Sequence, residues 1–170
     1  MGKPKDEKAA FDMIKSYAGD IHRVYTGVCL VIPFETDSEY EELIKKVRNF
    51  ETKAAEFYGL ENLCKEIVAP NDTIPDAPDN SVSDAPGVSG KTDRRYLAVS
   101  YSVYTNVHVV PMNDEEILKY AASGEPLDKA GAYAIQGGFA PFISAIEGDY
   151  YNVVGLPACS LYALLKSLPI

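Results

Sequence analysis

The sequence has few cysteines, and they form no recognisable pattern. Its 170 residues contain only Cys29, Cys64 and Cys159, an odd number at wide spacing. This spacing excludes a disulfide framework, and with only two histidines it also excludes a recognisable zinc site. We therefore expect an intracellular, reducing environment.

Positive charge is also scarce. Sixteen Lys and Arg residues against 25 Asp and Glu residues give a formal net charge of −9, which argues against general binding to nucleic acids or to anionic membranes. The longest apolar runs, such as residues 28–33, are too short to span a bilayer, and residues 1–10 lack the apolar core of a signal peptide. These observations predict a cytoplasmic protein with no nucleic-acid or membrane partner.

Several catalytic signatures are missing as well. The sequence has no serine or cysteine nucleophile elbow, no Walker lysine motif and no strand-linked G-x-G-x-x-G. His22 and His108 lie in alternating strands, where a structural role is favoured over catalysis. Asp114, Glu115 and Glu116 resemble a metal-binding trio, but the first turn of a helix prefers acidic residues in any case.

The pattern of apolar residues predicts a single α/β domain over residues 1–170, with a twisted mixed sheet and surrounding helices. The expected helices cover residues 6–17, 36–57, 61–69 and 113–124, with a last one from about residue 157, and the expected strands cover residues 22–32, 96–110 and 141–148. Residues 70–95 are interpreted as a mobile acidic loop rich in proline. Residues 34–95 as a whole are interpreted as an insertion between two long strands.

Three segments are candidates for binding chemistry. In "DKAGAYAIQGG", residues 128–138, small residues surround Lys129 and Gln136. The glycines serve either a tight crossing of the chain or a close approach of the backbone to a ligand, with Gln136 reading a base edge. In "GKPKD", residues 2–6, Lys3 precedes an electropositive helix start that suits a triphosphate, unless it belongs to a disordered terminus. In "GDYYNVVGLP", Asp149 or Asn152 caps a turn before a helix start after Gly155.

These segments, together with "GDIHRVYTGVCL" and "YTNVHVVPMNDEEILKYAASGEPLDKAGAYAIQGGFAPFI", resemble the Maf family of nucleoside triphosphate pyrophosphatases, closest to the branch that prefers dTTP and UTP. The resemblance implies hydrolysis of a nucleoside triphosphate to its monophosphate and pyrophosphate, with a divalent cation (Mg²⁺ or Mn²⁺). It also implies a catalytic role for Lys3 at the phosphates and base recognition by Gln136. Lys129 and Gly137 complete the expected substrate-binding set, and no metal ligand is assigned.

The sequence departs from the family pattern in two respects. Nothing in it matches the arginine-rich loop or the catalytic aspartate that precede the lysine-proline segment in family members, so a two-lobed Maf architecture shortened at its N-terminus is expected. Residues 33–95 are much longer than the usual turn between the two strands. The sequence therefore also leaves open a catalytically impaired nucleotide-binding or regulatory protein, and an interaction module built on the acidic insertion. A homodimer is a further expectation, because a shortened sheet would expose an edge.

Overall fold

The computed structural model describes residues 1–57, 60–68 and 95–168, and all statements below are confined to them. The expected acidic loop, apart from Arg95, lies outside the described residues. The helices and strands are α1 (Glu7–Lys15), β1 (Ile21–Phe34), α2 (Asp37–Phe57), β2 (Leu60–Val68), β3 (Arg95–Val109), α3 (Asp114–Ala121), β4 (Ile143–Glu147), α4 (Tyr150–Val154) and α5 (Ala158–Ser167). Three short 3₁₀ helices, η1 (Glu125–Asp128), η2 (Ala130–Ala132) and η3 (Ala140–Phe142), connect α3 to β4.

The sheet is built around β3. β1 pairs with it antiparallel along its whole length, from Ile21 opposite His108 to Phe34 opposite Arg95. β2 and β4 pair antiparallel with β3 on its other side, near opposite ends. The expected α/β fold with helices around a sheet is confirmed, but all described strand pairs are antiparallel, so the described sheet is not mixed.

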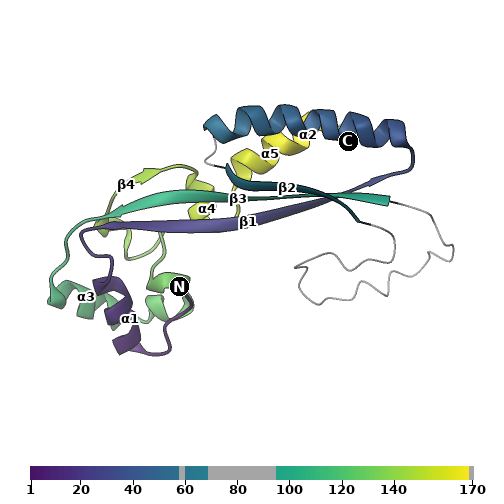
Figure 1. Ribbon diagram of the computed structural model, residues 1–170. Coiled ribbons are helices and arrows are strands. Elements are labelled where there is room, and N and C mark those ends of the chain that lie inside the picture. The colour runs from purple at the N-terminus through teal and green to yellow at the C-terminus, as the bar shows by residue number, and fades with distance from the viewer. Residues whose placement is uncertain (58–59, 69–94, 169–170) are drawn as a thin grey trace.

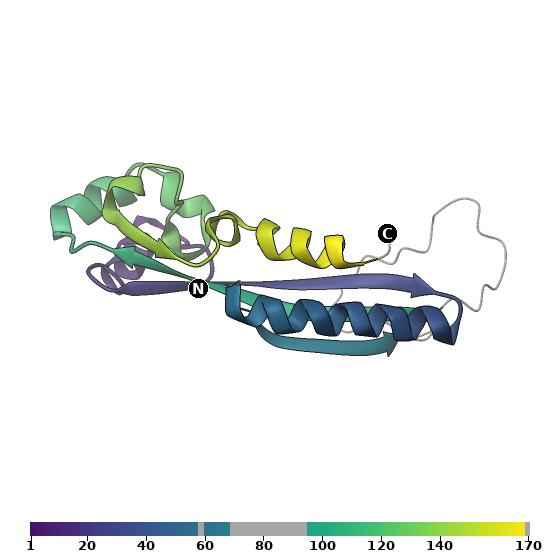
Figure 2. The ribbon, with the colours of Figure 1, turned by 90° about the horizontal axis from the view of Figure 1, so that it is seen from above.

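Two lobes lie at opposite ends of the long β1–β3 ribbon (Figures 1 and 2). We call α1, α3, residues 125–142 and β4 the first lobe, and α2, β2 and α5 the second lobe. Each has its own core, and β3 contributes to both, through Val107 and Val109 in the first lobe and through Leu97, Val99, Tyr101 and Val103 in the second. No described helix is both long enough and apolar enough to cross a membrane.

The helix starts follow the capping residues that the sequence contains. Asp6 accepts a hydrogen bond from the Ala9 N–H at 2.7 Å, and Asn113 forms a reciprocal capping box with Glu116. Thr36 and Glu39 exchange the same pair of bonds at the start of α2. Asp149 caps α4, so the expected turn at residues 149–152 is the start of a short helix, and the next helix, α5, follows Pro157.

The expected helix over residues 61–69 is wrong. Residues Leu60–Val68 form strand β2, whose backbone pairs with β3 from Val103 to Tyr96. The side of β3 that faces away from β1 would otherwise leave its N–H and C=O groups unpaired here, and pairing in a sheet outweighs a weak local preference for helix. The described part of the segment between β1 and β3 therefore consists of helix α2 and strand β2, which belong to the second lobe.

Candidate functional site

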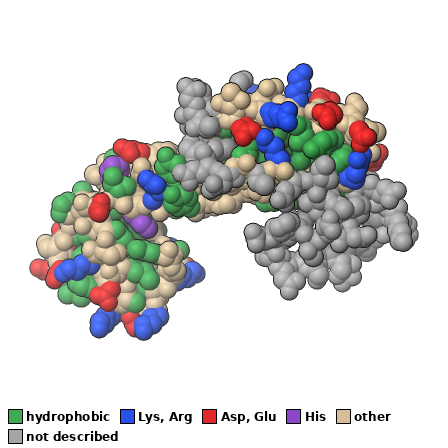
Figure 3. Space-filling model, in the orientation of Figure 1, with side chains coloured by type: hydrophobic (Ala, Val, Ile, Leu, Met, Phe, Trp, Pro, Cys, Tyr) green, Lys and Arg blue, Asp and Glu red, His purple; other side chains and the backbone are tan. Residues whose placement is uncertain are grey.

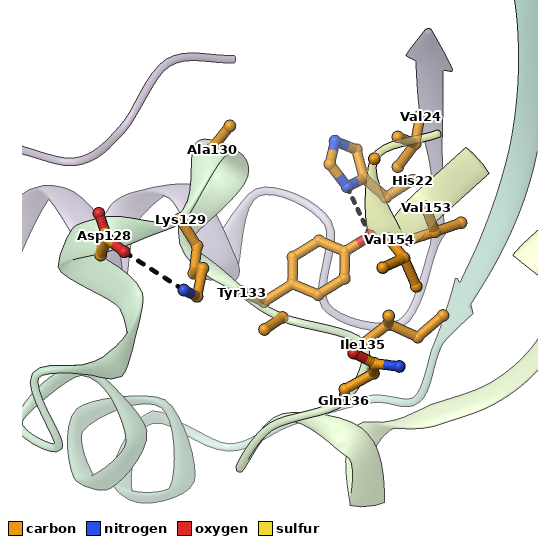
Figure 4. A pocket seen from close by; sticks show the side chains of 12 residues that line it. His22, Val24, Asp128, Lys129, Ala130, Tyr133, Ile135, Gln136, Val153 and Val154 are labelled. Atoms are coloured by element: carbon orange, nitrogen blue, oxygen red, sulfur yellow. Dashed lines mark hydrogen bonds and ion pairs between the residues drawn. The ribbon is translucent and has the colours of Figure 1, made fainter. Parts of the chain in front are cut away.

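A cavity of about 430 Å³ opens in the first lobe, where three segments distant in the sequence meet. Its walls are formed by His22 and Val24 of β1, residues 128–130 and 133–136, and residues 153–155 at the end of α4. Figure 4 shows the labelled side chains of these segments around a common space. The cavity therefore joins two of the three segments that the sequence marks as candidates.

The position of α4 in this wall depends on Asn152. Its buried side chain donates hydrogen bonds to the Val24 carbonyl and to Thr105 Oγ1, both at 3.1 Å. Thr105 in turn donates to the Asp149 carbonyl at 2.9 Å. These bonds fix α4 against the sheet and bring Val153, Val154 and Gly155 to the cavity.

Gln136 and Lys129, two of the expected substrate-binding residues, both line the cavity (Figure 4). The Gln136 side chain is exposed, so its amide is accessible to a ligand. Gly137, the third, is not among the lining residues. A Cβ atom at Gly137 would overlap the Glu125 carboxylate, which accepts hydrogen bonds from the Gly138 N–H and the Tyr120 hydroxyl. Gly137 therefore serves the close packing of the chain on Glu125.

Lys3, the expected catalytic residue, lies at the rim of the cavity and not in its wall. Its Nζ is 2.7 Å from Asp128 Oδ1, and Lys129 Nζ is 3.3 Å from Asp128 Oδ2. Asp128 and Gln136 line the same cavity. The ion pair between Lys3 and Asp128 therefore brings Lys3 next to the site that Gln136 lines. Lys3 and then Lys129 hold the pKa of Asp128 below its ordinary value. Lys129 in the wall and Lys3 beside it therefore place two ammonium groups against the one carboxylate of Asp128.

Gly131 explains why the segment carries so little side-chain bulk at its centre. Its φ of +74° favours glycine, and a Cβ there would lie 3.2 Å from His22 Cε1. Its N–H donates to the Gly2 carbonyl at 3.0 Å, and its carbonyl accepts from the Tyr17 hydroxyl at 2.8 Å. The segment is thus packed tightly against both the N-terminal residues and the start of β1.

His22 and Tyr133 are residues of the cavity that sequence reasoning did not assign to the site. His22 is hydrogen-bonded, as a structural histidine should be, since its Nδ1 lies 3.1 Å from the Tyr133 hydroxyl. The same side chain nevertheless lines the cavity. The sequence did contain a signal for His22. This histidine lies on the same, packed face of its strand as Val24, and a polar residue is unusual on such a face.

The described residues do not fit a divalent cation by themselves. Among them there is no group of three His, Cys, Asp or Glu side chains that could hold a metal ion. Asp128, the carboxylate in the cavity wall, is already paired with two lysines. Asp114 pairs with Lys15, and Glu116 caps α3, in agreement with the structural interpretation of that acidic trio. The divalent cation stays a prediction.

Residues 1–62 and 84–168 match the family described as Maf-like protein, so the chain belongs to this family. Curated relatives include proteins named dTTP/UTP pyrophosphatase. That of Alkaliphilus metalliredigens (strain QYMF) is 33% identical over 165 residues, which covers 97% of this chain and 55% of the relative. That of Clostridium novyi (strain NT) is 31% identical over 168 residues, covering 99% of this chain and 56% of the relative. The chain thus spans a little over half the length of these relatives.

Proposed function

We propose that the chain provides the nucleotide-binding site of a nucleoside triphosphate pyrophosphatase, a hydrolase that cuts dTTP- and UTP-type nucleotides into the monophosphate and pyrophosphate. One observation carries the proposal: a single cavity unites Gln136 and Lys129 with residues 153–155, and both segments lie within the residues that match the Maf-like family. The names of the relatives support the same substrate class.

The chemistry of the cavity suits a pyrimidine nucleotide. The edge of uracil or thymine presents carbonyl acceptors beside an N–H donor, and the carboxamide of Gln136 offers both a donor and an acceptor. Val24, Ile135, Val153 and Val154 supply apolar surface for the faces of a ring. Lys129 in the wall and Lys3 at the rim supply positive charge for a phosphate chain, in a protein whose overall net charge is −9.

A divalent cation belongs to the proposal as a requirement of the reaction, because it would neutralise charge on the phosphates. No step is assigned to it, since the described residues offer it no ligand cluster. The roles proposed for this chain are to bind the base, to orient the phosphates and to exclude water from the apolar walls.

The proposal also includes a cytoplasmic location, no nucleic-acid or membrane partner, and a homodimer. Cys29 and Cys159 are free thiols, which suits a reducing compartment. Among the described strands β1 pairs with β3 alone, so its other edge is a possible contact for a second copy. Sedimentation of the purified chain would test the dimer.

The deciding experiment uses the purified 170-residue chain with a panel of nucleoside triphosphates and Mg²⁺ or Mn²⁺. Isothermal titration measures binding, and release of pyrophosphate measures turnover. We expect UTP and dTTP to bind more tightly than ATP and GTP, with turnover of the pyrimidine nucleotides. Binding without turnover would limit the chain to nucleotide binding, and equal affinity for all bases would contradict the proposal.

A further inference from the structure

Three aromatic rings, those of Tyr17, His22 and Tyr133, form one cluster at the cavity, and His22 and Tyr133 line it. The His22 ring stacks on Tyr17, with centroids 4.8 Å apart and planes within 8°. Its Nδ1 lies 3.1 Å from the Tyr133 hydroxyl, a contact drawn as a dashed line in Figure 4. Tyr17 in turn donates to the Gly131 carbonyl at 2.8 Å. The cluster thus holds residues 131–133 at two points.

The backbone between these two points is strained. Ala132 has a φ of 65°, and among the described residues it is the one non-glycine residue with a positive φ. A left-handed alanine is unfavourable and persists where its surroundings fix it. Ala132 lies between Gly131, which Tyr17 holds, and Tyr133, which His22 holds. Residues 134–136 of the cavity wall follow directly.

We propose that His22, in its neutral form, is a positioning residue for nucleotide binding: by accepting a hydrogen bond from the Tyr133 hydroxyl at Nδ1, it holds the wall segment that carries Gln136 in its binding geometry. The inference rests on the proposed function, because it concerns the same cavity. It assigns His22 no contact with the reacting atoms.

The bond can form with either group as donor, but only one arrangement satisfies the Tyr133 hydroxyl proton, which contacts no other acceptor within the described ranges. In that arrangement Tyr133 donates, and burial raises the pKa of its hydroxyl to about 12, which keeps it protonated. His22 Nδ1 is then the acceptor, and the proton of the neutral ring is on Nε2. A second proton, on Nδ1, turns the acceptor into a donor. The buried Tyr133 proton then loses its partner, since no other acceptor contacts this hydroxyl within the described ranges.

The surroundings of His22 favour the neutral ring. Burial lowers the pKa of His22 below its ordinary value, and the N-terminal ammonium group lowers it further. The titratable and charged groups around the ring are Tyr17 from the turn after α1, Tyr133 from the wall segment, Asp128 and Lys129 across the cavity, and the N-terminus. Asp128 is paired with Lys3 and Lys129, so it offers little stabilisation to a protonated His22.

The test compares the affinity for UTP with Mg²⁺ at about pH 7.5 and about pH 5, on either side of the ordinary His pKa. His22→Asn retains an acceptor oxygen near the Nδ1 position that cannot be protonated in this range, and Tyr133→Phe removes the donor. His108→Asn is the matched control, because His108 lies outside the cavity, 3.3 Å from Glu147 Oε1. Ionisation of UTP is common to all variants and cancels in ratios of affinity.

At about pH 7.5 we expect Tyr133→Phe to bind UTP on the order of five-fold more weakly than the wild type, the loss expected for one buried hydrogen bond. As the pH falls, the wild type and His108→Asn should lose affinity relative to His22→Asn. A ratio of wild type to His22→Asn that stays constant with pH would overturn the inference alone. No binding by any variant at either pH would overturn the proposed function as well.

A measurement without nucleotide tests the bond itself and remains possible if Tyr133→Phe folds poorly. NMR titration of the His22 ring should give a higher pKa after Tyr133→Phe, because the neutral ring loses its donor. If that variant does not fold, the wild-type ring should show the proton on Nε2. An unchanged His22 pKa, or a proton on Nδ1, would contradict the proposed positioning role.

Discussion

The first and second lobes share one sheet, but their cores contain different side chains. In the first lobe Tyr17, Tyr120 and Tyr133 are buried around Phe139, and their hydroxyl groups bond to a loop carbonyl, a carboxylate and an imidazole. The second core consists mostly of aliphatic residues such as Val47, Leu97 and Leu164. Charged side chains lie on the outer surface of the second lobe (Figure 3). Aliphatic packing fills volume, whereas buried hydroxyl groups fix the exact path of a loop. The candidate site lies in the lobe where the loop path is fixed in this way.

The largest expected effects separate stability from binding. Phe139→Ala removes a fully buried ring that contacts Tyr17, Tyr120, Tyr133 and Phe142, and it should lower the free energy of unfolding by about 3–5 kcal/mol and abolish nucleotide binding. Leu164→Ala in the second lobe should lower it by about 2–5 kcal/mol but leave the affinity of the folded protein unchanged. Urea unfolding and titration with UTP measure both quantities. Equal loss of affinity in both variants would remove the distinction between the lobes.

A smaller effect is expected at Gly137. In Gly137→Ala the new methyl group displaces the Glu125 carboxylate from the Gly138 N–H and the Tyr120 hydroxyl, which should lower the free energy of unfolding by about 1–3 kcal/mol. Gly27→Ala is the control, because Gly27 lies on an exposed strand position with nothing within 4 Å of an added Cβ. That change should be within about 0.5 kcal/mol of neutral. Urea unfolding curves give the free energy of unfolding of both variants. If Gly137→Ala leaves this free energy unchanged, the Glu125 side chain can move aside without cost.

Gln136→Ala should change the choice of base with little change in stability, because the side chain is exposed in the folded protein. The loss of one recognition hydrogen bond should reduce the preference for UTP over other triphosphates by about five- to ten-fold. Competition titrations with UTP, CTP and ATP measure this preference. Equal weakening for every triphosphate would count against base recognition by Gln136.

Lys3→Ala should weaken triphosphates more than monophosphates, by a few-fold, because Lys3 is an exposed cation at the rim. Its loss also removes a partner of Asp128, so Asp128→Asn is the informative companion variant. Affinities for UTP and UMP, measured side by side, give the ratio. If both ligands weaken equally, the Lys3 contribution is not to the phosphate chain.

The smallest effects are expected for exposed ion pairs, one in each lobe. Lys15 pairs with Asp114 between α1 and α3, and Arg95 pairs with Asp37 beside α2. Asp114→Asn and Asp37→Asn should each lower the free energy of unfolding by less than about 1 kcal/mol, and less at high salt. Thermal unfolding at two salt concentrations would check this, and a larger loss for Asp114 would show that this pair orders the first lobe.

Much of the fold could be predicted from local signals. Asp6, Thr36 and Asn113 mark helix starts because their side chains cap nearby N–H groups, and alternation marks the strands because one face of the sheet is packed. Strand β2 could not be predicted from local signals, because it forms by pairing with β3. That strand begins more than twenty-five residues after β2 ends. The antiparallel sheet was missed for the same reason.

Site residues could be predicted where a polar side chain stands out within a segment of small residues. Gln136 and Lys129 are polar groups in a segment of small residues, and both line the cavity. Gly137 has an equally plausible pattern but packs on Glu125, a contact that depends on the folding of residues 125–138. His22 was assigned a structural role, since only the folded protein brings its strand against Tyr17, Tyr133 and the cavity.

Strand β3 has one further consequence for the behaviour of the molecule. It hydrogen-bonds to each of the other three described strands, and its side chains enter both cores. Neither end of the protein can lose its sheet without disturbing the same strand, so heat should melt the described chain in a single cooperative transition. A nucleotide bound at one end would then raise the melting temperature of the other end as well, although α2 and α5 contribute nothing to the cavity.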